Sequence, residues 1–197
     1  CNAVLGVEKD PQVAEVLREQ VRGVCNVTVV EGDVLKAALP AFNKVVSIPP
    51  YYLSSRLVTW LLERKVECAV LILQREFASR LVAAVGSEEY GWLTVLACYS
   101  AEVEVFDPVP RAMFYPQPEV DSVVVRLRLR KSAPFRVNDK VFFERMVRWL
   151  FTQRNRKLGN AIKSLVKGGV KAPKGDAEEL ACSLPFRDRR VRELSPK

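Results

Sequence analysis

The chain has 197 residues, enough for one medium-sized domain with a smaller appendage, and 49% of them are hydrophobic and 27% charged, as in ordinary globular proteins. No apolar stretch approaches the ~20 residues of a membrane-spanning helix, and no signal-peptide pattern opens the chain. The absence of histidine excludes a histidine-based triad, and five scattered cysteines argue against a zinc site or a disulfide framework. We therefore expect a cytoplasmic protein with reduced thiols, no metal and no membrane contact.

The net charge of +8 is distributed unevenly along the chain. Residues 1–125 hold 11 Lys and Arg against 16 Asp and Glu, whereas residues 126–197 hold 20 against 7. A basic region joined to a mildly acidic one is typical of a protein that holds a polyanion with one part. A solvated basic helical surface explains the composition equally well.

Short β-branched runs alternate with amphipathic segments in the first two thirds of the chain. Strands are expected at residues 3–7, 27–30, 44–48, 69–73, 103–109 and 122–129. Helices are expected at residues 11–22, 56–63, 76–85 and 91–99. This alternation predicts an α/β fold with a mostly parallel sheet, and the last two strands suggest an antiparallel edge.

After Arg130 the sequence changes character, because a Lys-Ser-Ala-Pro linker precedes three helical segments. Asn138 is the expected N-cap of a long helix. A second helix is expected at 158–166, ended by Gly168-Gly169, and a third near 176–182. We therefore expect two domains, an α/β domain at 1–130 and a small basic helical domain at 131–197.

Two acidic residues follow the first two expected strands. Ligands of open α/β sheets bind outside the carboxyl ends of the strands, so both acids are placed to meet a nucleoside-bearing cofactor. Glu8 suits the two hydroxyls of a ribose, and Asp33 suits an adenine amine, with Gly32 permitting close approach. Each acid alone is more often a solvated or helix-capping residue.

The third strand ends in Ser47-Ile48-Pro49-Pro50-Tyr51, where two prolines fix the backbone. A rigid carbonyl beside an aromatic ring suits a flat base with an exocyclic amine, since the ring stacks and the carbonyl accepts a hydrogen bond. For an isolated motif, a tyrosine that simply packs on the core is the competing interpretation.

Several segments in order resemble one family. They are Val-Glu-Lys-Asp-Pro (7–11), Val-Val-Glu-Gly-Asp (29–33), Ile-Pro-Pro-Tyr-Tyr-Leu-Ser-Ser (48–55), Leu-Gln-Arg-Glu-Phe-Ala-Ser-Arg-Leu-Val-Ala (73–83), Tyr-Gly-Trp-Leu (90–93), Phe-Tyr-Pro-Gln-Pro-Glu-Val-Asp-Ser (114–122) and Phe-Thr-Gln-Arg-Asn-Arg-Lys-Leu (151–158). Together they resemble the small-subunit rRNA adenine dimethyltransferases of the archaeal and eukaryotic style, which are class I S-adenosylmethionine-dependent methyltransferases with a Rossmann-like sheet. The resemblance covers nearly the whole chain.

The resemblance implies that the target adenine is turned out of its helix and held between Tyr51 and Phe114, while the Pro49 carbonyl holds its amine. No catalytic base is needed, because the proton leaves after methyl transfer. The implied catalytic residues are Ile48, Pro49, Pro50, Tyr51 and Phe114, and the implied cofactor-binding residues are Glu8, Lys9, Asp33, Val34, Ser47 and Ile48. The basic residues expected to track rRNA phosphates are Arg154, Arg156, Lys157, Lys163 and Lys167.

The sequence departs from the family pattern at two places. No GxG occurs among the nine glycines, and the first strand matches the family's second, so we expect the sheet to lack its first strand and glycine-rich loop. Ile48 stands where the family usually has asparagine, whose side chain is the second acceptor for the target amine. Loss of one such acceptor costs about 3 kcal/mol, or ~100-fold in rate.

The function expected from these features is S-adenosylmethionine-dependent methylation of adjacent adenosines near the 3′ end of small-subunit rRNA, by a monomer that binds the rRNA or a pre-ribosomal particle. The first alternative is a catalytically weak or inactive RNA-binding ribosome-assembly factor, which Ile48 and the missing glycine-rich loop favour. The archaeal-style segments weigh against a methyltransferase of large-subunit rRNA that confers antibiotic resistance. A DNA adenine methyltransferase is disfavoured because no separate DNA-recognition segment is present.

Overall fold

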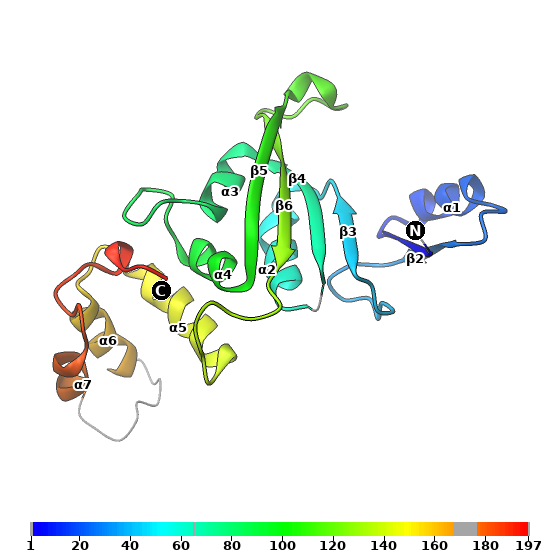
Figure 1. Ribbon diagram of the computed structural model, residues 1–197. Coiled ribbons are helices and arrows are strands. Elements are labelled where there is room, and N and C mark those ends of the chain that lie inside the picture. Colours follow the sequence, from blue (N-terminus) through cyan, green and yellow to red (C-terminus); the bar gives the residue numbers. More distant parts are fainter. Residues whose placement is uncertain (1, 65, 168–176, 197) are drawn as a thin grey trace. The chain divides into compact units, whose positions relative to one another are not determined.

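The computed structural model describes residues 2–64, 66–167 and 177–196, and leaves the side chain of Lys167 undescribed (Figure 1). The chain forms two compact units, Cys1–Phe42 and Asn43–Lys197. The sequence pattern did not predict this division. The domain boundary expected at residue 130 stays a prediction.

The first unit is a β-α-β element. Strand β1 (Val4–Glu8) and strand β2 (Val27–Glu31) pair in parallel, and helix α1 (Pro11–Gln20) connects them. The helix begins at Asp10, whose side chain accepts hydrogen bonds from the backbone N–H groups of Gln12 and Val13, and it continues with a proline at its first position. Both features are ordinary helix-start signals.

The second unit is built on a four-stranded sheet in the order β3-β4-β6-β5. Strands β3 (Lys44–Ser47) and β4 (Cys68–Gln74) pair in parallel, whereas β6 (Ser122–Leu129) runs antiparallel to both β4 and β5 (Ala101–Val109). The expected combination of parallel and antiparallel pairing is confirmed, with the antiparallel strand one position inside the edge. All six expected strands are present, and each of their ends lies within two residues of the predicted one.

The central strands bury one face of the sheet. Alternate residues of β4 and β6 are buried, and the intervening residues of β6 include arginines that are partly or fully exposed. The helices between the strands are α2 (Ser54–Leu62), α3 (Arg75–Leu81) and α4 (Trp92–Ser100), and their apolar residues complete the core. The period of two expected for 122–129 is therefore confirmed.

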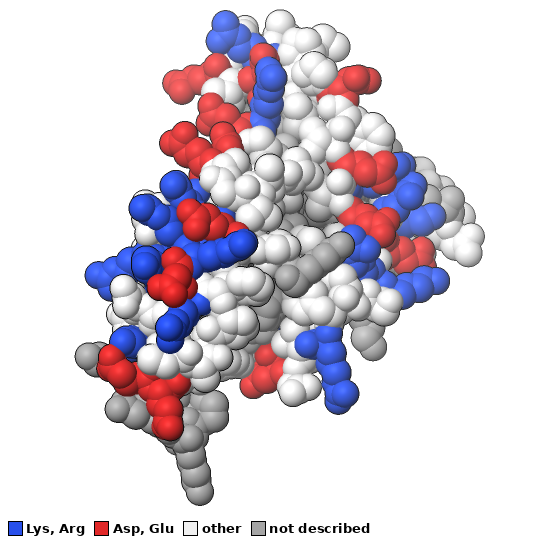
Figure 2. All heavy atoms as spheres, turned by 60° about the vertical axis from the view of Figure 1, so that its left-hand side comes forward, with Lys and Arg blue, Asp and Glu red and all other residues white. Residues whose placement is uncertain are grey.

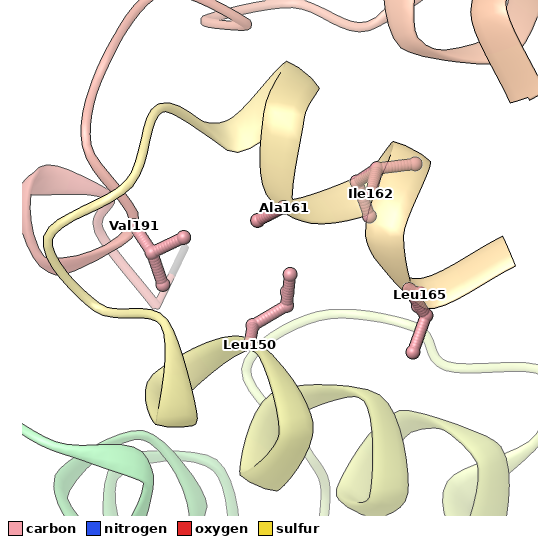
Figure 3. Packing of buried hydrophobic residues seen from close by; sticks show 5 residues of the cluster. All are labelled: Leu150, Ala161, Ile162, Leu165 and Val191. Atoms are coloured by element: carbon pink, nitrogen blue, oxygen red, sulfur yellow. The ribbon is translucent and has the colours of Figure 1, made fainter. Parts of the chain in front are cut away.

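Three helices follow the sheet: α5 (Lys140–Thr152), α6 (Leu158–Lys167) and α7 (Ala177–Ser183). Their cluster of buried residues comes from α5, α6 and the short 3-10 helix η3 (Val191–Glu193), as Figure 3 shows for Leu150, Ala161, Ile162, Leu165 and Val191. The prediction that Asn138 caps α5 is wrong. The cap is Asp139, because its carboxylate accepts a 2.9 Å hydrogen bond from the Phe142 backbone N–H. The stop predicted at Gly168-Gly169 lies outside the described residues.

The loop between α3 and α4 is hydrogen-bonded to the chain around η3, near the C-terminal end. The Gly86 N–H donates to the Arg192 carbonyl at 3.0 Å, and the Tyr90 hydroxyl donates to the Leu194 carbonyl at 2.8 Å. Burial raises the pKa of Tyr90 to about 12. We call residues 86–90 the junction segment.

No helix in the described part of the chain is long and apolar enough to cross a membrane. Within the same residues, no group of three His, Cys, Asp or Glu side chains is arranged to hold a metal ion.

Candidate functional site

The carboxyl edge of the four-stranded sheet carries the candidate target site. Strands β3, β4 and β5 all end at this edge, which is uppermost in Figure 1, and β6 begins there. Three chain segments leave it: the turn at 48–50, the start of α3 and the loop at 110–121. The sheet thus brings together segments that are up to about 70 residues apart in sequence.

The turn after β3 presents an available carbonyl group. Pro49 is buried and Pro50 is exposed. The Pro50 carbonyl accepts a 2.8 Å hydrogen bond from the Leu53 N–H in the short 3-10 helix η1 (Tyr51–Leu53). No described residue donates a hydrogen bond to the Pro49 carbonyl, so its lone pairs have no protein donor among these residues.

Ile48 and Ser47 flank this carbonyl on the amino-terminal side. Ser47 is the last residue of β3 and is half-buried. The side chain of Ile48 is 60% exposed, so the core does not require its apolar character. Neither the Ser47 nor the Ile48 side chain provides the amide oxygen that the resemblance leads us to expect at residue 48.

The ring of Tyr51 is held at its far end. Its hydroxyl lies 2.7 Å from the Ser122 hydroxyl oxygen, and either group can donate. Ser122 is the first residue of β6, is 0% exposed, and pairs with Gln74 and Val109 at the ends of the neighbouring strands. The half-buried Tyr51 is therefore tied to a buried residue that is paired on both sides within the sheet.

Phe114 follows the 3-10 helix η2 (Arg111–Met113) in the loop after β5. Its N–H donates to the Arg111 carbonyl at 3.2 Å, and the Arg111 N–H donates to a carboxylate oxygen of Asp121 at 3.0 Å. Phe114 is half-buried and makes no ring contact with Tyr51, both being described residues. The two rings predicted to sandwich a base thus lie on loops from the same edge without packing on each other.

An open groove of about 300 Å³ lies at the same edge. Its lining is mostly charged and comes from Arg75, Glu76, Arg111, Glu119, Val120 and Asp121. Such a lining suits a polar part of a ligand rather than a flat base.

The first unit carries the two acids predicted to bind the cofactor, Glu8 and Asp33. Glu8 and Glu31 end the paired strands β1 and β2, and the Gly32 N–H donates to the Glu8 carbonyl at 2.7 Å. Gly32 has a φ of 150°, a conformation that favours glycine, and it brings Asp33 to the edge where Glu8 lies. The expected grouping of Glu8 and Asp33 at one edge is thus present in the structure.

Both carboxylates also support their own turns. One oxygen of Glu8 accepts from the N–H groups of Lys9 and Asp10 at 2.7 and 2.9 Å. One oxygen of Asp33 accepts from the Leu35 N–H at 2.9 Å, and the intervening Val34 is half-buried. Their other carboxylate oxygens make no hydrogen bond with described residues, so each acid can fix its turn and still accept from a ligand.

The basic residues predicted to bind RNA have different surroundings. Arg154 donates to the carbonyl groups of Ser87 and Glu88 at 2.9 and 2.8 Å, which gives it a structural role at the junction segment. The others have side-chain partners at the surface: Arg156 with Gln153, Lys157 with Asp188, and Lys163 with Glu178. The side chain of Lys167 lies outside the described part. In Figure 2, the Lys and Arg clusters are broken by Asp and Glu side chains.

Sequence reasoning missed Asp121 and Ser122 as members of the site. Both lie in segment 114–122, of which only Phe114 was expected in the site. Their roles depend on hydrogen bonds to residues 10 and 71 positions away, and a strand-start pattern does not reveal such partners.

Comparison with known proteins gives a consistent result. The family described as ribosomal RNA adenine dimethylase matches residues 1–179. A protein of Methanosarcina mazei, named a probable ribosomal RNA small subunit methyltransferase A, is 39% identical over 196 residues, covering 98% of this chain and 71% of that protein. A protein of Thermococcus onnurineus with the same name is 38% identical, covering 98% and 70%.

Solved structures show the same relationship. A dimethyladenosine transferase of Plasmodium falciparum matches with a TM-score of 0.81 and 25% identity, covering 98% of this chain and 78% of that one. The 23S rRNA methyltransferase ErmE matches with a TM-score of 0.65 and 30% identity over the same shares. The fold is that of the Rossmann-like class I methyltransferases, and the chain belongs to the ribosomal RNA adenine dimethylase family.

Proposed function

We propose that the protein transfers methyl groups from S-adenosylmethionine to the exocyclic amines of adjacent adenosines near the 3′ end of small-subunit rRNA. The observation that carries this proposal is the turn after β3, where no described residue donates to the Pro49 carbonyl and the hydroxyl of Tyr51, two residues further on, is held by Ser122. The names of the archaeal relatives support small-subunit rRNA as the substrate.

The residues at the β1–β2 edge fit the adenosine part of the cofactor. A ribose offers two hydroxyl donors and adenine offers an amine donor, and Glu8 and Asp33 each keep one carboxylate oxygen available for such donors. Lys9, Val34, Ser47 and Ile48 complete the proposed cofactor contacts. When bound, S-adenosylmethionine supplies an electrophilic methyl group, so the protein mainly has to position the acceptor.

The carboxyl edge of the second unit provides that positioning. We assign Tyr51 and Phe114 to the two faces of the adenine, and Pro49 to its amine. A carbonyl that accepts one N–H of the amine fixes the direction of the nitrogen lone pair and stabilises positive charge that develops on nitrogen. Pro50 stiffens the turn, and the amine proton passes to solvent after transfer, which is compatible with a chain without histidine.

Ile48 is expected to lower the rate of methyl transfer. With isoleucine in place of a second acceptor, one N–H of the amine finds no partner in this turn, and transfer is slower than in a family member with asparagine there. Slower transfer caused by Ile48 favours the alternative function, an assembly factor that binds RNA without modifying it.

The basic region at 131–197 is proposed to hold the rRNA or a pre-ribosomal particle through its phosphates, with the protein acting as a cytoplasmic monomer. The proposed contacts are Arg154, Arg156, Lys157, Lys163 and Lys167. Exposed ion pairs contribute little to stability, about 0–1 kcal/mol, so phosphates can replace Asp188 beside Lys157 and Glu178 beside Lys163.

The proposal is tested on the full-length protein by calorimetry with S-adenosylmethionine, followed by methyl transfer to unmethylated small-subunit particles. We expect cofactor binding and incorporation of label into adenosine. Cofactor binding without any transfer would instead support the assembly factor. Absence of both would contradict the proposed roles of Glu8 and Asp33 as well.

A further inference from the structure

Three loops at the carboxyl edge of the sheet are attached to two neighbouring residues, Asp121 and Ser122. The Ser122 hydroxyl binds the Tyr51 hydroxyl, the Asp121 carbonyl accepts the Arg75 N–H at 3.1 Å, and the Asp121 carboxylate accepts the Arg111 N–H at 3.0 Å. The loops after β3, β4 and β5 are therefore all fixed to the start of β6.

Ser122 is well suited to hold a side chain in one place. It is 0% exposed and lies between the ends of β4 and β5, to which β6 is paired. A buried hydroxyl without a partner is costly, so Ser122 favours the one orientation of Tyr51 that satisfies both hydroxyls. The Tyr51 ring is then fixed at both ends, by its backbone in η1 and by its hydroxyl.

Asp121 does the same for the loop that carries Phe114. Its carboxylate fixes the first residue of η2, and the Arg111 carbonyl in turn accepts the Phe114 N–H at 3.2 Å. The Arg111 side chain also donates to the Glu119 carbonyl at 3.2 Å, which closes the loop on itself. Two successive hydrogen bonds through Arg111 thus connect Phe114 to Asp121.

We infer that Asp121 and Ser122 are positioning residues that set Tyr51 and Phe114 relative to each other, so that the target base enters a preformed slot. This inference rests on the proposed function, since it concerns how the base is held for methyl transfer. The hydrogen bonds that hold Tyr51 and the loop of Phe114 come from Ser122, the first residue of β6, and from Asp121 immediately before it. Small displacements of reacting groups cost large factors in rate, which gives the pair its importance.

A double-mutant cycle tests the Ser122 arm in the full-length protein. Tyr51→Phe keeps the stacking ring and removes only its hydroxyl, and Ser122→Ala removes only the partner. We expect each variant to lower kcat about tenfold with the KM for S-adenosylmethionine unchanged, and the double variant to lose no more than either alone. Multiplicative losses, about a hundredfold in the double variant, or no loss in Tyr51→Phe would overturn the inference.

Tyr90→Phe is the matched control for a lost tyrosine hydrogen bond. Its hydroxyl donates at 2.8 Å to the Leu194 carbonyl, away from the carboxyl edge, so its loss should lower the melting temperature and leave kcat unchanged. If Ser122→Ala behaved as Tyr90→Phe does, with a lower melting temperature and an unchanged kcat, Ser122 would be only structural and the inference would fail.

The Asp121 arm uses a conservative pair. Asp121→Asn keeps an oxygen that accepts the Arg111 N–H, whereas Asp121→Ala removes it. We expect kcat to fall about tenfold in Asp121→Ala and to stay within about threefold of wild type in Asp121→Asn. Equal kcat in all three proteins overturns the role of Asp121. A wild-type protein that transfers no methyl group overturns the proposed function itself, and an active wild type with insensitive variants overturns this inference alone.

Discussion

The carboxyl edge of the sheet and the surface of the C-terminal helices use hydrogen bonds in opposite ways. At the edge, a fully buried serine holds a tyrosine 71 residues away in sequence, at 2.7 Å. In the C-terminal region, Lys157 and Asp188, which lie just outside α6 and α7, pair at 3.3 Å while their side chains are 58% and 74% exposed. One arrangement is fixed by burial, and the other is open to exchange with water and ions.

The difference matches what each region has to do in the proposed function. Methyl transfer depends on the placement of one nitrogen, so the residues around it must not move. Phosphate binding depends on the number of nearby cations, and exposed ion pairs can change partners at little cost. Changes at the edge should therefore affect turnover, and changes on the helices should affect affinity and its dependence on salt.

Replacement of Tyr51 by alanine should have the largest effect. The variant loses both the stacking surface and the hydroxyl held by Ser122, so we expect methyl transfer to fall by more than ~100-fold, since base–aromatic stacking alone contributes about 1–3 kcal/mol. Cofactor affinity, measured by calorimetry, should be largely spared. Tyr52→Ala is the control, because its side chain is 79% exposed and no hydrogen bond of its hydroxyl is present among described residues. Unchanged turnover in Tyr51→Ala would show that the target pocket lies elsewhere.

Replacement of Ile48 by asparagine should raise activity. The change restores the second acceptor that the family usually has at this position, so we expect kcat to rise by up to about 100-fold. Because Ile48 is 60% exposed, stability should change by no more than about 0.5 kcal/mol. Ile48→Gln serves as the control, since it adds an amide of different reach. A wild-type protein as fast as Ile48→Asn would show that the missing acceptor is supplied by another group.

Replacement of Arg154 by alanine should reduce stability more than RNA binding. Its guanidinium donates to two backbone carbonyl groups of the junction segment, and their loss should lower the free energy of unfolding by about 1–3 kcal/mol. Chemical denaturation measures the change. Arg154→Lys should recover only part of it, because an ammonium group cannot reproduce the planar two-donor geometry. An unfolding midpoint equal to that of the wild type would contradict the structural role.

The sequence was sufficient to predict all six strands. Their β-branched runs, and the period of two in the last strand, are visible in a few consecutive residues and do not depend on distant partners. It was also sufficient to place Glu8, Asp33 and Tyr51 at strand ends. It could not predict that Arg154 donates to Ser87 and Glu88, or that Ser122 holds Tyr51, because such bonds join segments through the tertiary fold. The cap expected at Asn138 lies at Asp139, because both residue types cap helices equally well and the backbone conformation decides which of two neighbours serves.

The smallest expected effects concern Arg156 and Lys157. If each contacts one phosphate, its replacement by alanine should reduce the slope of log K against log salt concentration by about 1 and leave kcat at saturating RNA unchanged. Filter binding or anisotropy with small-subunit rRNA over a range of salt concentrations measures the slope. Arg18→Ala is the matched control, since Arg18 forms exposed ion pairs with Glu15 and Glu31 in the first unit, outside the proposed RNA surface. Unchanged slopes in the Arg156→Ala and Lys157→Ala variants would remove these two residues from that surface. A lower kcat at saturating RNA would show that this region also helps to position the base.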